Sequence, residues 1–364
     1  MSELFSPIRF RGVTLANRVA VSPMCEYSYE DGFSNDWQLV HLGSRAVGGA
    51  GLVMTEATAV LPEGRITPGD LGIWKDEHIA PLKRVVDFLH TQGARAGVQI
   101  AHAGRKGSMD LPWKGERLVP PAEGGWENVM APSAIPFRDD HAMPQALDEA
   151  GIARVVGAFA DAAVRAKKAG FDVVEVHSAH GYLLHEFLSP LSNQRTDKYG
   201  GSFENRTRLL LEIVDAVRAV LPEDAPVFVR ISATDWAEGG WDIDECVQLA
   251  KLLKQHGVDL VDTSSGGNIA TQKIALGPGY QVPFAERIRR EAGIATGAVG
   301  MITEAKQAEA IIAEGKADIV LLAREMLRDP YWAVHAAKEL GVPMTWVPQY
   351  LRAAPQGSGM REKI

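Results

Sequence analysis

Short apolar segments recur along the whole chain, and each is followed by a polar or amphipathic stretch. Eight of these segments are rich in valine, isoleucine and leucine and are apolar at nearly every position. Continuous apolar character over so few residues indicates a strand that is buried on both faces, as in a parallel sheet covered by helices. The predicted strands are RVAVS (18–22), GLVMTEA (51–57), RAGVQIA (95–101), DVVEVH (172–177), PVFVRIS (226–232), VDLVDTS (258–264), IATGAVG (294–300) and ADIVLLA (317–323).

Amphipathic segments separate the predicted strands, most clearly at 77–93 and 152–170. Several of them end in a glycine, the residue that best adopts the left-handed conformation after a helix. These glycines are Gly93, Gly170, Gly257 and Gly315. Eight strand–helix alternations without a linker or a composition shift predict a single α/β domain over residues 1–364. We expect a (β/α)8 TIM barrel rather than an open doubly wound sheet.

Two segments depart from this alternation. Residues 102–147 hold many of the prolines, glycines and tryptophans and are too long for an ordinary strand–helix loop. They are predicted to form a lid or small hairpin excursion after the third strand. The segment 347–364 follows the last predicted helix, beyond the point where the barrel closes. Its polar, glycine-containing end, 356–364, is predicted to fray.

Composition and charge narrow the class of protein. The 364 residues carry a formal net charge of -8 and no basic stripe, which argues against a nucleic-acid partner. No apolar run approaches the roughly 18 residues of a membrane span, and the N-terminus lacks the apolar region of a secretory signal. The two cysteines, Cys25 and Cys246, are too few for a disulfide framework, so we expect a cytoplasmic protein.

Polar side chains follow the ends of most predicted strands. Active sites of (β/α)8 barrels lie at these C-terminal strand ends, and the loops after strands seven and eight commonly bind phosphate. A barrel with no other role than structure would not need polar groups on one rim. The candidates are Ser22-Pro23-Met24-Cys25, Tyr27, Glu56, Ala57, Gln99, His102, His177, His180, Arg230, Gly297, Gly300 and Arg324.

His177 and His180, in VEVHSAHGYLLHEF (174–187), allow three interpretations. As metal ligands they would need a third histidine or an acidic partner. Each could also be an ordinary packing residue. As two neutral N–H donors they would grip one substrate oxygen, and the neighbouring phenol of Tyr182 could supply a proton to a developing carbanion. Tyr182 alone would more often be a buried aromatic residue with a bonded hydroxyl.

Long collinear motifs resemble the old yellow enzyme family, and more narrowly its bacterial, thermophilic-like ene-reductase branch (the NADPH dehydrogenase or xenobiotic reductase type). The resemblance extends from the first predicted strand to Pro330 and covers nearly the whole chain. The motifs are SPMCEYS (22–28), EATAVLPEGRIT (56–67), QIAHAGRK (99–106), EVHSAHGYLLHEFLSPLSNQRTDKYGGSFENR (175–206), REMLRDP (324–330) and PQYLR (348–352).

The resemblance implies an FMN-dependent NAD(P)H:acceptor oxidoreductase. Its co-substrate would be NADPH or NADH. Its acceptors would be α,β-unsaturated carbonyl and nitro compounds, whose C=C bonds it would reduce by a ping-pong mechanism. The two substrates would use one face of the flavin in turn.

The same resemblance implies roles for individual residues. Tyr182 would be the proton donor, and His177 and His180 would hold the substrate carbonyl or nitro oxygen. Tyr27 would lie on the substrate side. The implied FMN contacts are Ser22, Pro23, Met24, Cys25, Ala57, Gln99, Arg230, Gly300, Ala323 and Arg324. Ala323 departs from the family, which often has glycine there, and a positive φ at this position would strain an alanine.

PQYLR resembles the C-terminal motif with which this branch of the family sends an arginine into a neighbouring subunit's active site. The resemblance therefore implies a homodimer or a dimer-based homotetramer in which Arg352 reaches the partner's substrate. A solvated tail residue is the simpler alternative.

Other classes of protein have to be weighed against this one. A metal-dependent TIM-barrel hydrolase or lyase would use His177 and His180 as ligands and be colourless, whereas a flavoprotein is yellow. A non-catalytic flavin-binding or scaffold protein would leave Tyr182 and the histidine pair without a purpose. A relative with an iron–sulfur cluster is excluded, because cluster ligation takes four cysteines and the chain has two.

Overall fold

The fold is a closed barrel of parallel strands, seen in a computed structural model that describes residues 2–115 and 117–361. All eight predicted strands are present, so the predicted (β/α)8 barrel is confirmed. Around the barrel the order is β10-β11-β12-β3-β4-β5-β8-β9. The strands are β3 (Val19–Val21), β4 (Leu52–Ala59), β5 (Arg95–Ala101), β8 (Val173–Ser178), β9 (Val227–Ser232), β10 (Leu260–Ser264), β11 (Ala295–Ala298) and β12 (Ile319–Leu322).

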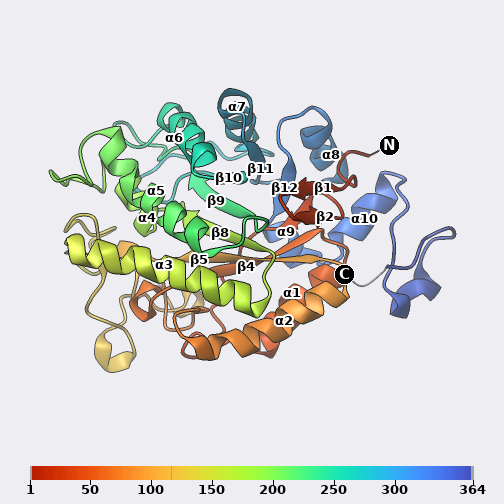
Figure 1. The fold of residues 1–364 in the computed structure, drawn as a ribbon, viewed down its shortest axis with the longest axis horizontal. Coiled ribbons are helices and arrows are strands. Elements are labelled where there is room, and N and C mark those ends of the chain that lie inside the picture. The colour runs from red at the N-terminus through yellow and green to blue at the C-terminus, as the bar shows by residue number, and fades with distance from the viewer. Residues whose placement is uncertain (1, 116, 362–364) are drawn as a thin grey trace.

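Helices surround the barrel (Figure 1). Most of the long ones begin at a polar residue whose side chain accepts a backbone N–H of the first turn, as Asp148 accepts from Gly151 at 2.7 Å. The helix that follows Asp148 ends at Gly170, which has a φ of 95°. The helices are α1 (Asp36–Val47), α2 (Ile79–Thr91), α3 (Glu149–Ala169), α4 (Leu183–Leu188), α5 (Phe203–Val220), α6 (Ile243–Gln255), α7 (Val282–Ala292), α8 (Ala305–Ala313), α9 (Arg324–Arg328) and α10 (Trp332–Glu339).

A short antiparallel hairpin precedes the barrel and was not predicted from the sequence. It consists of β1 (Ile8–Phe10) and β2 (Val13–Leu15). Phe10 packs edge-on against Phe228 of β9 with ring centroids 5.1 Å apart. The hairpin therefore shares an apolar cluster with the barrel strands, and it continues the core at the N-terminal end of the barrel.

Residues 102–147 lie at the other end of the barrel, in orange to yellow (Figure 1), and contact α4 through η3 and β6. They contain three short 3-10 helices, η3 (Gly104–Lys106), η4 (Pro112–Lys114) and η5 (Pro121–Glu123). Two residues of β6 (Met130–Ala131) pair in parallel with β7 (Gln145–Ala146), and a single antiparallel bridge joins Met109 to Leu118. We call this segment the lid from here on.

The C-terminal segment folds back on the barrel. After η6 (Pro348–Ala353), a bridge joins Trp346 to Met360, and the Arg361 guanidinium donates to the carbonyl oxygens of Ala46 (2.8 Å) and Gln92 (3.0 Å). These hydrogen bonds differ from the predicted fraying at Arg361, because this half-buried arginine binds carbonyls at the ends of α1 and α2. Residues 362–364 lie outside the described part of the chain.

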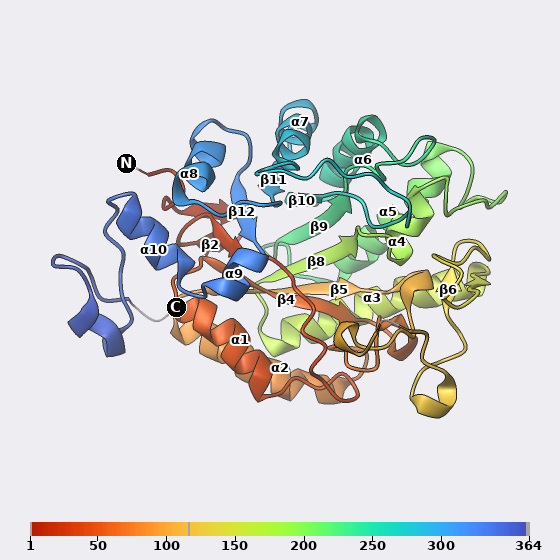
Figure 2. The same cartoon turned by 180° about the vertical axis from the view of Figure 1, so that it is seen from behind.

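The lid and the C-terminal segment lie at opposite sides of the molecule in both views (Figures 1 and 2). None of the helices in the described ranges is long and apolar enough to cross a membrane.

Candidate active site

Strand register brings several predicted site residues side by side. Ala57 of β4 is the register partner of Gln99 on β5, and His177 of β8 is the partner of Arg230 on β9. Ser22 follows β3 directly and is buried, with no hydrogen-bond partner for its hydroxyl. The predicted convergence at the C-terminal strand ends is therefore seen for these residues.

His177, His180 and Tyr182 form one cluster at the end of β8. The His177 ring lies edge-on to both neighbours, with ring centroids 5.2 Å from His180 and 5.3 Å from Tyr182. The Nδ1 atom of His177 is buried and has no partner among the described residues. An unpaired buried nitrogen costs free energy unless a ligand binds it, so this cluster has the character of a binding site.

The loop that carries His180 has an unusual backbone. His180 has a φ of 60°, in the left-handed region that residues other than glycine seldom adopt. Its N–H donates to the Ser232 hydroxyl at 2.9 Å, and its Nε2 lies 2.7 Å from the Ser264 hydroxyl. Gly181 follows with a φ of 71°. A Cβ at Gly181 would lie 2.5 Å from Asn268 Cα, so only glycine fits.

Burial fixes the protonation state of the cluster. It lowers the pKa of His177 and of His180 well below the ordinary value, and the nearby Arg230 charge lowers both pKa values further. Burial also raises the pKa of Tyr182 well above its ordinary value. Near neutral pH the site therefore presents two neutral imidazoles beside a protonated phenol.

A buried charge network lies beneath the rim. Arg230 Nε is 3.1 Å from Asp262 Oδ2, and Gln99 Nε2 donates to Glu175 Oε1 at 2.8 Å. Burial raises the pKa of both Glu175 and Asp262, and their mutual repulsion raises that of Glu175 further. The Asp262 contact leaves the terminal nitrogens of Arg230 outside the ion pair. Glu175 and Asp262 lie inside strands, and nothing in the sequence indicates that they belong to a buried charge network.

A second buried carboxyl lies behind the segment after β3. Glu56 accepts a hydrogen bond from the Glu26 backbone N–H at 2.8 Å and another from the Tyr29 hydroxyl. Burial raises the pKa of Glu56 to about 8. Burial, together with the carboxyls of Asp70 and Glu56, raises the pKa of Cys25 well above its ordinary value, so Cys25 is a neutral thiol.

A cavity of about 430 Å³ opens between the loops after β11 and β12. Gly300, Ala323 and Arg324 line it. Gly300 has a φ of 118°, and a Cβ there would meet Gln281 Nε2 at 2.7 Å. Ala323 has a φ of −100°, so the position does not need the positive φ that would favour glycine.

Gly297, the other candidate glycine, is needed for a different reason. It lies within β11, where a Cβ would collide with the Leu321 side chain. It does not line the cavity, so its role is in packing against β12.

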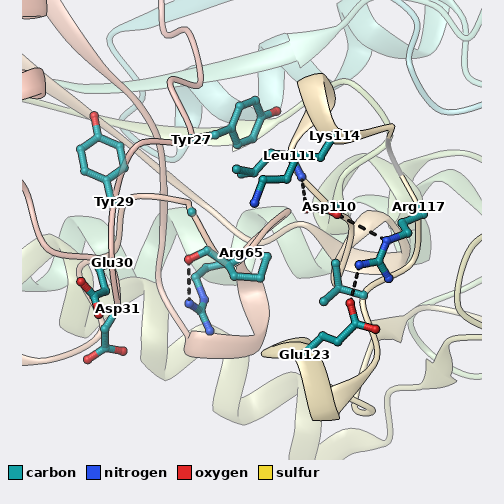
Figure 3. Close-up of a pocket in the computed structure, with 13 residues that line it drawn as sticks. Tyr27, Tyr29, Glu30, Asp31, Arg65, Asp110, Leu111, Lys114, Arg117 and Glu123 are labelled. Carbon is teal, nitrogen blue, oxygen red and sulfur yellow. Dashed lines mark hydrogen bonds and ion pairs between the residues drawn. The ribbon is translucent and has the colours of Figure 1, made fainter.

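A larger cavity, of about 540 Å³, lies between the segment after β3 and the lid (Figure 3). Tyr27 borders it, and Tyr27 also lies edge-on to Trp113 of the lid, with ring centroids 6.2 Å apart. Leu111, Lys114 and Arg117 of the lid line the opposite wall. Any ligand that extends past Tyr27 therefore meets the lid.

Arg352 lies in η6 and is exposed. The C-terminal segment that contains η6, in dark blue, lies on the side of the molecule away from the lid (Figures 1 and 2). The structure therefore does not bring it to the active site of its own chain. Within residues 2–115 and 117–361 no group of three or more His, Cys, Asp or Glu side chains could hold a metal ion.

Comparison with known proteins gives one family. The family described as "NADH:flavin oxidoreductase / NADH oxidase family" matches residues 3–342. A protein named NADPH dehydrogenase from Geobacillus sp. (strain WCH70) is 52% identical over 351 residues, which cover 96% of this chain and 98% of the relative. The NADPH dehydrogenase of Listeria innocua serovar 6a is 50% identical over 355 residues, covering 97% and 99% of the two chains.

Solved structures of similar barrels include morphinone reductase, with a TM-score of 0.79 and 29% identity over 94% of this chain and 90% of that one. A 2-naphthoyl-CoA reductase matches with a TM-score of 0.84 and 26% identity. That match covers 93% of this chain, which spans about half (52%) of the reductase chain.

Proposed function

The chain belongs to the NADH:flavin oxidoreductase / NADH oxidase family, and from that premise we propose that it is an ene-reductase. It is an NAD(P)H dehydrogenase with FMN as its flavin and NAD(P)H as its reductant. We propose that its acceptors are α,β-unsaturated carbonyl and nitro compounds. The single observation that carries this proposal is the cluster of His177, His180 and Tyr182.

The residues present fit FMN. The cavity lined by Gly300, Ala323 and Arg324 offers backbone N–H groups and one guanidinium, which suit a phosphate. The unpartnered Ser22 hydroxyl, the terminal nitrogens of Arg230 and the amide of Gln99 would hold the polar edge of the ring system. We assign the remaining flavin contacts to Pro23, Met24, Cys25 and Ala57. When bound, FMN supplies the hydride for the acceptor.

The chain's own residues supply binding and proton transfer. Neutral His177 and His180 can each donate one N–H to the substrate oxygen, and two donors withdraw electron density from the conjugated C=C bond. Tyr182 keeps its proton because burial raises its pKa. It can therefore protonate the α-carbon as negative charge develops there. Tyr27 borders the cavity beside the lid, and we assign it to the substrate side.

The geometry also supports a ping-pong mechanism. The histidine–tyrosine cluster is one site, and we infer that the nicotinamide and the acceptor occupy it in turn. The cavity between Tyr27 and the lid lies where the rest of either molecule would extend (Figure 3). Lid residues such as Leu111 are therefore the ones we expect to select among acceptors.

We further propose a homodimer, or a tetramer built from dimers, in which Arg352 completes the partner's site. Two observations support this. Arg352 is exposed and remote from its own lid, whereas the segment that carries it is held on the barrel by Arg361. A guanidinium presented on an anchored segment can make a charge-assisted hydrogen bond to a substrate or flavin oxygen.

Separate measurement of the two half-reactions tests the proposal. Purified protein should be yellow and release FMN on denaturation. NADPH should reduce the flavin without oxygen, and 2-cyclohexen-1-one or a nitroalkene should then reoxidise it. Steady-state double-reciprocal plots should be parallel. Flavin reduction by NADPH without reoxidation by any enone, maleimide or nitroalkene would contradict the ene-reductase assignment.

A further inference from the structure

Lys106, at the start of the lid, places a cation against the catalytic loop. Its ammonium donates to the backbone carbonyl of His180 at 2.7 Å and to that of Gly267, on the loop after β10. Both acceptors are neutral carbonyls. Lys106 therefore joins two loops that border the site by charge-assisted hydrogen bonds.

The surroundings of Lys106 disfavour the charged form of its side chain. Its ammonium lies over the Phe137 ring at 4.2 Å and over the Tyr182 ring at 5.3 Å. Burial lowers the pKa of Lys106 to about 7, the Glu186 carboxyl opposes that shift, and the Arg105 and Arg138 charges add to it. A lysine placed where its charge is disfavoured is more often functional than structural.

The carbonyl that Lys106 holds belongs to the strained residue of the site. His180 is in the left-handed region, which costs on the order of 1 kcal/mol or more for a residue with a side chain. Ser232 fixes its N–H, and Ser264 fixes one ring nitrogen. The hydrogen bond from Lys106 fixes a third group of His180, its backbone carbonyl.

We propose that Lys106 is a positioning residue for the oxidative half-reaction. It holds His180 in the left-handed conformation that directs the imidazole toward the substrate oxygen. Because Lys106 belongs to the lid, the orientation of the imidazole depends on the position of the lid. The proposal rests on the assignment of His180 as a substrate ligand.

Contacts of the neighbouring residues link the hydrogen bond between Lys106 and His180 to the rest of the lid. The Arg105 guanidinium donates to the Asn268 carbonyl at 2.7 Å, and the Arg105 N–H donates to Glu186 of α4 at 2.8 Å. This holds η3 against α4, so that Lys106 starts from a fixed backbone. Phe137, which covers its ammonium, comes from the later part of the lid. Displacement of the lid would therefore expose the ammonium to water.

The test compares Lys106→Met with Lys251→Met in the FMN-loaded protein. Lys251 is an exposed lysine of α6 that lines neither cavity of the site, so it serves as the matched control. Losing a hydrogen bond from a charged donor should lower the affinity for a phenol, read from the flavin absorbance, by about tenfold or more. Enone reoxidation should slow by a similar factor, whereas flavin reduction by NADPH and FMN content should change less than about twofold. Lys106→Arg, which keeps the charge, should recover part of both losses.

Each outcome has one meaning. Unchanged phenol affinity and enone reoxidation in Lys106→Met would overturn the proposal, and so would equal losses in both half-reactions or a loss of FMN. If Lys106→Met does not fold, the same comparison is made with Lys106→Arg and Lys106→Gln, where only the charged variant should approach the wild type. If the wild type reduces no enone, the proposed function fails, and phenol affinity still tests Lys106.

Discussion

Burial alone keeps the phenol of Tyr182 in the protonated form that a proton donor needs. Its phenol borders the neutral imidazole of His177, and its pKa is raised because the phenolate would be poorly solvated there. The residue is therefore a proton donor of constant state across the ordinary pH range. Its usefulness comes from position, since it is the ring next to His177.

Replacing Tyr182 by phenylalanine keeps the ring and removes the proton. We expect flavin reduction by NADPH to change less than about threefold, while enone reoxidation falls by about 10²-fold, the range of a lost general acid. Nitroalkenes should suffer less, because their developing anion needs little protonation at carbon. Stopped-flow absorbance separates the two steps. An equal loss with every acceptor would show that Tyr182 only packs.

Glu56 provides a test of stability against pH. Its pKa is about 8 in the fold and about 4.3 in an unfolded chain. The folded protein therefore retains a proton that the unfolded chain releases, and stability falls as pH rises between these values. Relative to Glu56→Gln, the wild type should lose roughly 1 kcal/mol of unfolding free energy per pH unit from about 4.5 to 8.

Urea denaturation at several pH values measures this difference. Glu30→Gln, at an exposed carboxyl of the same segment, should show no such slope. A constant difference between wild type and Glu56→Gln across the window would mean that Glu56 is ionised in the fold.

At the scale of elements, the loops before and after α4 each contain a glycine with a positive φ, in different surroundings. Gly181 and Gly201 both have a positive φ, of 71° and 83°. A Cβ at Gly181 would meet the backbone of Gly267 and Asn268, whereas at Gly201 nothing lies within 4 Å. Comparing the two positions separates backbone strain from collision.

Gly201→Ala should therefore cost only about 1 kcal/mol of stability and leave activity unchanged. Gly181→Ala should cost about 2 kcal/mol more, and it should weaken phenol binding because the loop that carries His180 must move. Thermal unfolding and a phenol titration measure both effects. Similar losses in the two variants would show that the loop yields easily.

The eight barrel strands were predictable because burial on both faces leaves a continuous apolar signal of a strand's length. The N-terminal hairpin was not, because three-residue strands such as Ile8–Phe10 carry no period. Polar residues after the strands, such as His177, stood out against the apolar runs. Lys106 did not, since an isolated lysine in a loop gives no sign that it will be covered by Phe137. The folded end of the chain escaped prediction because Arg361 binds carbonyls far away in sequence.

At the scale of the whole molecule, the exposed Arg352 predicts a shared site. Light scattering should show dimers or tetramers at assay concentration. Arg352→Ala should raise the KM for the enone by about tenfold, the worth of a charge-assisted hydrogen bond, while FMN content stays intact. A fully active monomer would refute the shared site.

Subunit exchange between two impaired variants tests the shared site more strictly. In a mixed dimer of Arg352→Ala and Tyr182→Phe chains, one site would have both its own Tyr182 and the partner's Arg352. Activity should therefore recover after subunit exchange, to at most about half that of the wild type in exchanged dimers. No recovery after verified exchange would mean that Arg352 acts within its own chain or not at all.

The pairing of β3 with β12 has a consequence for folding of the chain during its synthesis. Val19 is the register partner of Val320, roughly 300 residues later, so one edge of β3 stays open until almost the whole barrel has left the ribosome. Exposed strand edges promote association between nascent chains. We expect truncated chains that end before β12 to bind chaperones or aggregate, and the barrel to be completed only after translation has nearly finished.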